Sequence, residues 1–161
     1  MLVLVACSTG SCTIAKRWLA RSCTVGASAS LEAELRAAGA RAERDLLDAY
    51  SNGSGSLADE VAAEAGREYE EVIAALDAGR SYGLSPAEVT LIRSESEQVH
   101  MREARNEFDR AYRRAALSGL GILARPEGIA LLRRIATNPA SVDRETAVAV
   151  LQRAGLPVTP P

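Results

Sequence analysis

Over most of the chain, apolar residues recur every three or four positions, which is the spacing of one face of an α-helix. This pattern predicts a first helix over residues 31–49, with Ser30 as its N-cap. The run at 51–56 contains only Ser, Asn and Gly and predicts a flexible linker. A second helix is predicted over 57–78, and Gly79 follows it at the position where glycine commonly ends a helix.

The clearest helix start in the chain is the run Ser85-Pro86-Ala87-Glu88. Serine is a favoured N-cap, proline fits the first helical position, and an acid at the third position completes a capping box. We therefore predict one long helix from about 86 to 117, ended by Ser118-Gly119. A polar stretch at 102–107 divides its apolar residues into two patches. We interpret these patches as two partner-binding surfaces, made of Val89, Ile92 and Val99 and of Phe108 and Tyr112.

A pair of shorter helices is predicted near the C-terminus. Pro126 opens the first of them, and Pro139 follows its end. Ser141 or Asp143 caps the second. The tail at 156–161 contains three prolines and cannot be helical.

These elements predict an all-α fold of about five helices without a substantial sheet. Only residues 1–6 carry a strand pattern. The chain is expected to have three parts: an atypical segment at 1–30, a helical region at 31–118, and the C-terminal helix pair with its tail at 119–161.

Composition places the chain among ordinary globular proteins. It has 161 residues, of which 47% are apolar and 25% are charged. No run approaches the roughly 18 apolar residues that a membrane-spanning helix needs, so no transmembrane segment is predicted. Aromatic residues make up only 4%, so the core is expected to consist mainly of smaller aliphatic side chains.

Charge is distributed unevenly along the chain. Residues 1–31 hold three basic residues and no acid, whereas the remainder holds 16 basic and 21 acidic residues. The densest acidic stretch, 57–79, has seven acids and only Arg67 as a cation. This asymmetry predicts docking between segments or onto a partner. Lys16 is the only lysine, which we interpret as the codon usage of a high-GC genome.

The first thirty residues contain all three cysteines and the only tryptophan, Trp18. We favour a docking segment of the mature protein, with Trp18 as a partner-binding residue. Two alternatives remain. The run at 4–7 resembles a bacterial lipobox, in which Cys7 would be acylated, although the preceding stretch is short and lacks basic residues. The acid-free composition also resembles an organellar targeting peptide.

Patterns that would indicate catalysis or metal binding are weak. The cysteines have no C-x-x-C spacing and no nearby histidine. Glu97 and His100 have the Glu-x-x-His spacing of di-iron bundles, but His100 is the only histidine and such a site needs two. Residues 8–11 resemble a phosphate-binding loop without the glycine-lysine pattern that defines one. We therefore predict no catalytic, cofactor or metal site.

One resemblance to a known family concerns the C-terminal helix pair. The runs 129–136, 144–147 and 151–156 resemble the helical pair near the C-terminus of some phage small terminase subunits, and equally a HEAT-like helix pair. The terminase resemblance implies a ring-forming adaptor for DNA packaging. That family's DNA-binding helix-turn-helix is not clearly matched. Residues 61–76 have its spacing, but three acids in the recognition helix would oppose binding to phosphates.

These observations predict a non-enzymatic structural or adaptor subunit of a larger assembly, intracellular or within a large particle. It would bind protein subunits, as a homo- or hetero-oligomer, through helix faces. The alternatives are a DNA-associated helical adaptor and an exported lipoprotein anchored at Cys7. Nucleic acid is the less favoured partner at a net charge of −2. If it binds, the contacts are expected from Arg133, Arg134, Arg144 and Arg153.

Overall fold

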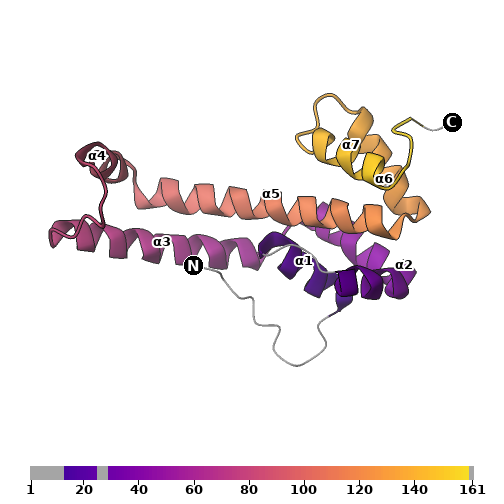
Figure 1. The fold of residues 1–161 in the computed structure, drawn as a ribbon, viewed down its shortest axis with the longest axis horizontal. Helices are drawn as coiled ribbons and strands as arrows, with labels where there is room; N and C mark the ends of the chain where they lie inside the picture. The colour runs from indigo at the N-terminus through magenta and orange to yellow at the C-terminus, as the bar shows by residue number, and fades with distance from the viewer. Residues whose placement is uncertain (1–12, 25–28, 160–161) are drawn as a thin grey trace. The chain divides into compact units, whose positions relative to one another are not determined.

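The structure, a computed structural model, describes residues 13–24 and 29–159. In these residues the fold is all-α, with seven helices and no strand, which confirms the predicted class (Figure 1). The predicted number of about five helices is too low. The strand pattern at 1–6 and the phosphate-loop pattern at 8–11 lie outside the described residues. The helices are α1 (Ile14–Thr24), α2 (Ala29–Asn52), α3 (Ser56–Asp77), α4 (Pro86–Ser94), α5 (Glu97–Leu123), α6 (Pro126–Thr137) and α7 (Arg144–Arg153).

The helices belong to two compact units. The first, which we call the core unit, combines residues up to 53 with residues from 110 onward. The second, which we call the acidic unit, consists of residues 54–109. These units differ from the division expected at 30 and 118, because segments far apart in sequence share one hydrophobic core.

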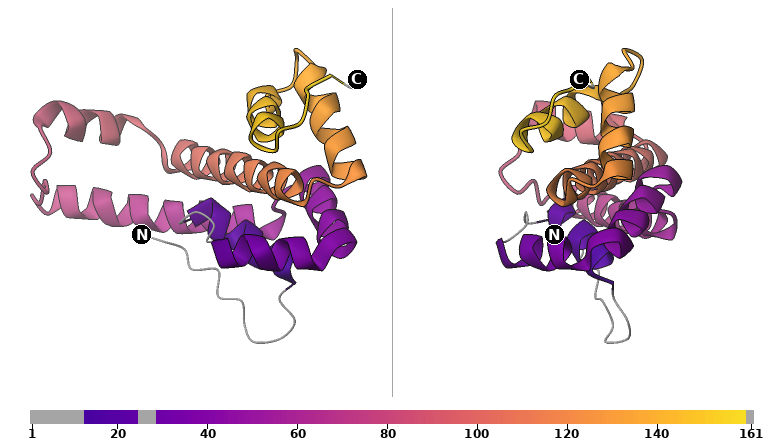
Figure 2. Two further views of the ribbon diagram at one scale, coloured as in Figure 1. Left: turned by 45° about the vertical axis from the view of Figure 1, so that its right-hand side comes forward. Right: turned by 90° about the vertical axis from the view of Figure 1, so that its right-hand side faces the viewer.

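The core unit is built from α1, α2, the C-terminal part of α5, α6 and α7. In it, α1 packs on α2, and α6 packs on α7 as the predicted helical pair (Figure 2). Leucine and alanine dominate the interior, as the low aromatic content predicted. The largest fully buried side chains are Trp18, Leu35, Leu46, Leu117, Leu120, Leu132 and Leu151.

The acidic unit is held together mainly by small residues and polar contacts. Its buried apolar residues are Ala58, Ala62, Ala75 and Leu76. The buried Gly66 of α3 lets Met101 of α5 approach, since a Cβ at Gly66 would lie 3.0 Å from the methionine sulfur. Ion pairs Arg105–Asp59 (3.0 Å) and Arg93–Asp77 (2.7 Å) link α3 to α5 and to α4. This unit therefore has little hydrophobic core of its own.

The long helix predicted over 86–117 begins where expected, at Pro86, but the prediction is wrong about its continuity and about its end. Two helices occupy this region, because Glu95 adopts an extended conformation and interrupts the helical backbone. The hydroxyl of Ser96 accepts a hydrogen bond from the backbone N–H of Val99 (3.3 Å) and so begins α5. Ser118 and Gly119 do not end α5, which continues to Leu123.

The predicted start of α4 is confirmed in detail. The Ser85 hydroxyl accepts a hydrogen bond from the backbone N–H of Glu88 (3.3 Å), and the Glu88 carboxylate accepts one from the backbone N–H of Ser85 (2.8 Å). Pro86 occupies the first helical position. All of these signals are local in sequence, which is why the pattern was sufficient to find them.

The linker expected at 51–56 is shorter in the structure, because the helices on either side extend into it. Only residues 53–55 separate α2 from α3. Gly53 and Gly55 have φ values of 71° and 56°, which glycine adopts without strain. Ser54 is buried between them, and its backbone N–H and its hydroxyl both donate to the Asp109 carboxylate.

Candidate interaction surfaces

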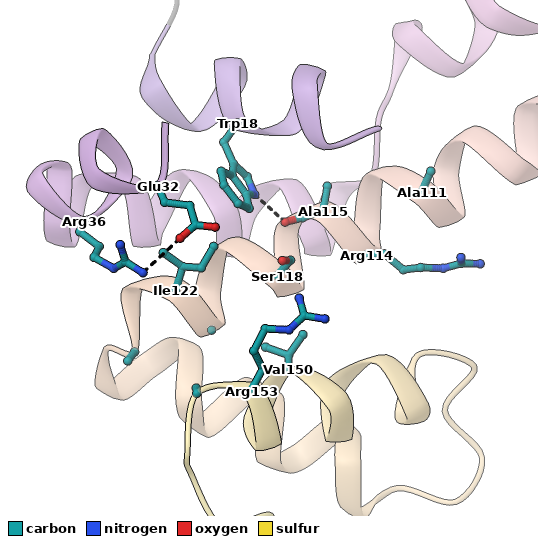
Figure 3. Close-up of a pocket in the computed structure, with 13 residues that line it drawn as sticks. Trp18, Glu32, Arg36, Ala111, Arg114, Ala115, Ser118, Ile122, Val150 and Arg153 are labelled. Carbon is teal, nitrogen blue, oxygen red and sulfur yellow. Dashed lines mark hydrogen bonds and ion pairs between the residues drawn. The ribbon is translucent and has the colours of Figure 1, made fainter. Parts of the chain in front are cut away.

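The core unit carries a groove among the described residues (Figure 3). Its volume is about 780 Å³, and α1, α2, α5 and α7 all contribute to its lining. That size is within the range of small-ligand and peptide sites. The apolar part of the lining includes Trp18, Ile122 and Val150, and the charged part consists of Glu32, Arg36, Arg114 and Arg153.

Three arginines give the groove a positive charge. Arg36 pairs with Glu32 on the next turn of α2, with an N–O distance of 3.3 Å. Arg114 and Arg153 are exposed, and neither has an ion-pair partner in the part of the chain that the structure describes. The charged groups of the lining therefore sum to +2. In Figure 3 the three guanidinium groups lie at separate places along the groove and do not converge on one point.

Trp18 is part of the core and not of an exposed contact surface. Its side chain is 1% exposed, and its indole N–H donates a 2.8 Å hydrogen bond to the carbonyl of Ala115. A Cβ at Gly119 would lie 2.8 Å from the indole nitrogen, so glycine at this position allows α1 and α5 to approach. Trp18 was expected to bind a partner. The structure instead makes it the wall between the core and the groove.

The first predicted apolar patch lies in the acidic unit, where Val89, Ile92 and Val99 are all half-buried. The structure adds two exposed residues that the sequence pattern did not single out. The Leu91 side chain of α4 is 61% exposed, and Tyr82, just before α4, is 72% exposed.

The second predicted patch is divided between the two units. Phe108 belongs to the acidic unit, and Tyr112 belongs to the core unit, where it packs against the hydrophobic core. Both side chains are half-buried. Tyr112 therefore has a packing role whether or not it contacts a partner.

The four arginines expected to contact nucleic acid have different local roles. The Nε atoms of Arg133 and Arg144 donate to the carbonyls of Pro157 and Ala136, both at 3.2 Å. Arg134 is exposed near the end of α6. Arg153 lines the groove and is the only one of the four that does so.

A buried carboxylate joins two elements of the core unit, and no local sequence pattern indicates it. Glu43 is 4% exposed and accepts hydrogen bonds from the Nε of Arg125 and from the backbone N–H of Gly128, both at 2.9 Å. The Glu43 carboxylate thus accepts from a free N–H group in the first turn of α6, where the helix dipole favours a negative charge. Both partners are more than 80 residues away in sequence.

A second buried polar contact connects α2 to the start of α7. The hydroxyl of Tyr50 donates to the Asp143 carboxylate at 3.1 Å, and Arg113 lies 4.0 Å from the same oxygen. Burial, followed by the charge of Asp143 and this hydrogen bond, raises the pKa of Tyr50 above its usual value of 10.0. A tyrosine held in its neutral form as a donor is suited to a structural role.

Metal-binding side chains do not gather at one place in the described helices. In residues 13–24 and 29–159 no group of three or more His, Cys, Asp or Glu side chains is placed to hold a metal ion. The His100 ring lies 5.6 Å from that of Tyr69, between centroids. Cys7 and Cys12 lie outside the described residues. None of the described helices is both long and apolar enough to span a membrane.

The two units carry opposite net charges. The core unit contains 14 basic and 8 acidic residues, a net charge of +6, whereas the acidic unit contains 5 basic and 13 acidic residues, a net charge of −8.

Comparisons with protein families, with characterised proteins and with solved structures find no match to this chain. The resemblance of residues 129–156 to small terminase subunits stays a prediction. The function is therefore inferred from the surfaces of the two units.

Proposed function

We propose that this protein is a non-enzymatic structural or adaptor subunit of a larger assembly, and that α4 binds a protein partner. The observation that carries this proposal is that α4 contains no buried residue, although it has a complete capping box and apolar side chains. A partner helix or groove would cover those side chains.

The length and composition of α4 support this function. A nine-residue helix is too short to be stable alone in water, because nucleation is costly and few hydrogen bonds follow it. The capping box and the Arg93–Asp77 ion pair stabilise the helix from within the acidic unit. Leu91, the exposed apolar side chain of α4, would add hydrophobic burial when a partner covers it, at about 25 cal/mol for each Å² removed from water.

The test is the native mass of the protein purified from its own source, with affinity capture of its partners. We expect a heteromeric complex that is lost in Leu91→Asp and kept in Thr90→Asp, a control with the same charge on the neighbouring exposed residue. Circular dichroism checks that both variants remain helical. A wild-type monomer at high concentration with no captured protein would contradict the proposal.

A second candidate function is DNA association through the core unit. The net charge of +6 on that unit favours it, since neutralising phosphates supplies most of the affinity for nucleic acid. The test is retention on DNA over a salt series. Binding should weaken as salt increases, and Arg133→Glu with Arg134→Glu should reduce it. No retention at low salt would remove this candidate.

The third candidate, an exported lipoprotein, depends on Cys7, which lies outside the described residues. The intact mass of the protein from its own source decides it. A lipidated chain that begins at Cys7 would support this candidate, and an unmodified Met1 would exclude it.

A further inference from the structure

We propose that the arginine-lined groove of the core unit binds the acidic face of α3 from a second copy of this chain. The inference rests on the function proposed above, because it names one neighbour of the assembly subunit. It uses a different surface from α4, so the two contacts are separately testable.

Positive charge is spread along the groove and is not gathered at one point. Arg153 lies in the middle of the groove, with Arg36 and Arg114 towards its two ends (Figure 3). A compact anion such as phosphate is held best by donors that converge on it. A row of separated guanidinium groups is instead complementary to an extended surface with several carboxylates.

Helix α3 presents such a surface. Its glutamates at 60, 64, 68 and 71 are spaced by four, four and three residues, which places them on one face of the helix. They extend over about 16 Å at the usual rise of 1.5 Å per residue. Arg67 lies on the same face and pairs with Glu64. The other three glutamates have no ion-pair partner in the described part of the chain.

The net charges of the whole units also favour this contact. The core unit at +6 and the acidic unit at −8 attract each other between copies, although the complete chain has a net charge of only −2. This attraction acts over about one Debye length, roughly 10 Å at 0.1 M salt, so it orients the two copies at short range. Arginine favours carboxylates through paired, planar hydrogen bonds, which a glutamate face provides.

The test measures self-association of the full chain by sedimentation velocity, after nuclease treatment, over a concentration series at low and high salt. We expect association at low salt that weakens as salt increases. Reversing the groove charge with Arg114→Glu and Arg153→Glu should raise the dissociation constant at least about tenfold. Reversing the helix charge with Glu68→Arg and Glu71→Arg should do the same.

Two matched controls separate a specific contact from a general effect of charge. Arg41→Glu with Arg44→Glu makes the same change of charge on exposed residues of α2 outside the groove. Glu103→Arg with Glu107→Arg does so on exposed residues of α5 in the acidic unit. Both controls should weaken association much less than the groove and α3 variants do, because they change the charge of a unit but not the contact itself. An equimolar mixture of the groove variant and the α3 variant should associate more tightly than either alone, because the reversed surfaces are again complementary.

Circular dichroism shows that each variant is folded, and the mixture tests the contact even if one variant is destabilised. A wild-type chain that is monomeric at every concentration would overturn the inference. So would groove variants that behave like their controls, or association that disappears with nuclease. None of these results removes the α4 contact, which the capture experiment with Leu91→Asp tests on its own.

Discussion

The indole N–H of Trp18 donates a 2.8 Å hydrogen bond to the backbone carbonyl of Ala115, 97 residues later in the chain. The bond is buried and joins α1 to the C-terminal part of α5, beneath the arginine-lined groove. Because an indole N–H can only donate and a buried donor needs an acceptor, this contact determines where α1 lies on α5. The wall of the groove therefore depends on the same contact that completes the core.

Gly119→Ala tests this packing. The added Cβ would lie 2.8 Å from both Leu46 Cδ1 and Trp18 Nε1, so at least one side chain must move. We expect a loss of about 1–3 kcal/mol in the free energy of unfolding, measured by urea denaturation with circular dichroism. Alanine has the higher intrinsic helix propensity, so a variant without steric conflict would gain about 1 kcal/mol instead. Ser118→Ala, one position away, is the control and should change stability little.

Glu43→Ala tests the buried link between α2 and α6. The variant leaves the backbone N–H of Gly128 without its acceptor and Arg125 without its partner. We expect a loss of about 2–3 kcal/mol in the free energy of unfolding, since a buried donor without an acceptor costs its full desolvation energy. The control is Glu127→Ala, an exposed acid in the first turn of α6. Equal losses in the two variants would contradict a special role for Glu43.

The raised pKa of Tyr50 predicts how stability changes in alkaline solution. Between its usual value of 10.0 and the higher value in the folded state, the unfolded chain loses the tyrosine proton while the folded chain keeps it. The contribution of Tyr50 is therefore complete below pH 10 and decreases as the pH rises through the folded pKa. The Tyr50→Phe variant has no titrating hydroxyl at this position, so its free energy of unfolding should not show this part of the decrease. Urea denaturation at pH 8, 10 and 11 measures the free energy of unfolding of both proteins. If that free energy decreased equally with pH in the wild type and in Tyr50→Phe, the result would contradict this role of Tyr50.

The capping box of α4 predicts an effect at acidic pH. The side-chain and backbone hydrogen bonds from Ser85 lower the pKa of Glu88 below its usual value of 4.5. The stabilisation of the helix start is therefore present above pH 4.5 and is lost as the pH falls through the folded pKa. The protection of the α4 amides against hydrogen exchange, relative to unfolded amides at the same pH, should decrease over that range in the wild type. Glu88→Gln should remove most of this dependence, and an unchanged pH profile in that variant would exclude the capping box as its cause.

Some elements were predictable because their signals lie within one or two helical turns. The Ser85 capping box, Pro126 at the start of α6 and the pair formed by α6 and α7 all match the sequence pattern. The break between α4 and α5 was missed, since Glu95 and its neighbours are compatible with a helix and only the extended backbone at Glu95 ends α4. The exposed Leu91 was missed because periodicity indicates an apolar face but not whether the chain covers it.

The sequence by itself determined the all-α class, the helix starts with strong caps and the uneven distribution of charge, since each depends on residue type and short-range spacing. Only the tertiary structure decided that Trp18 is buried, that Glu43 meets Arg125 across 82 residues, and that three arginines from three helices line one groove. The physical reason is that burial and ion pairing depend on which segments pack together. Which segments pack together is decided by the hydrophobic core that residues distant in sequence share, and not by any local pattern.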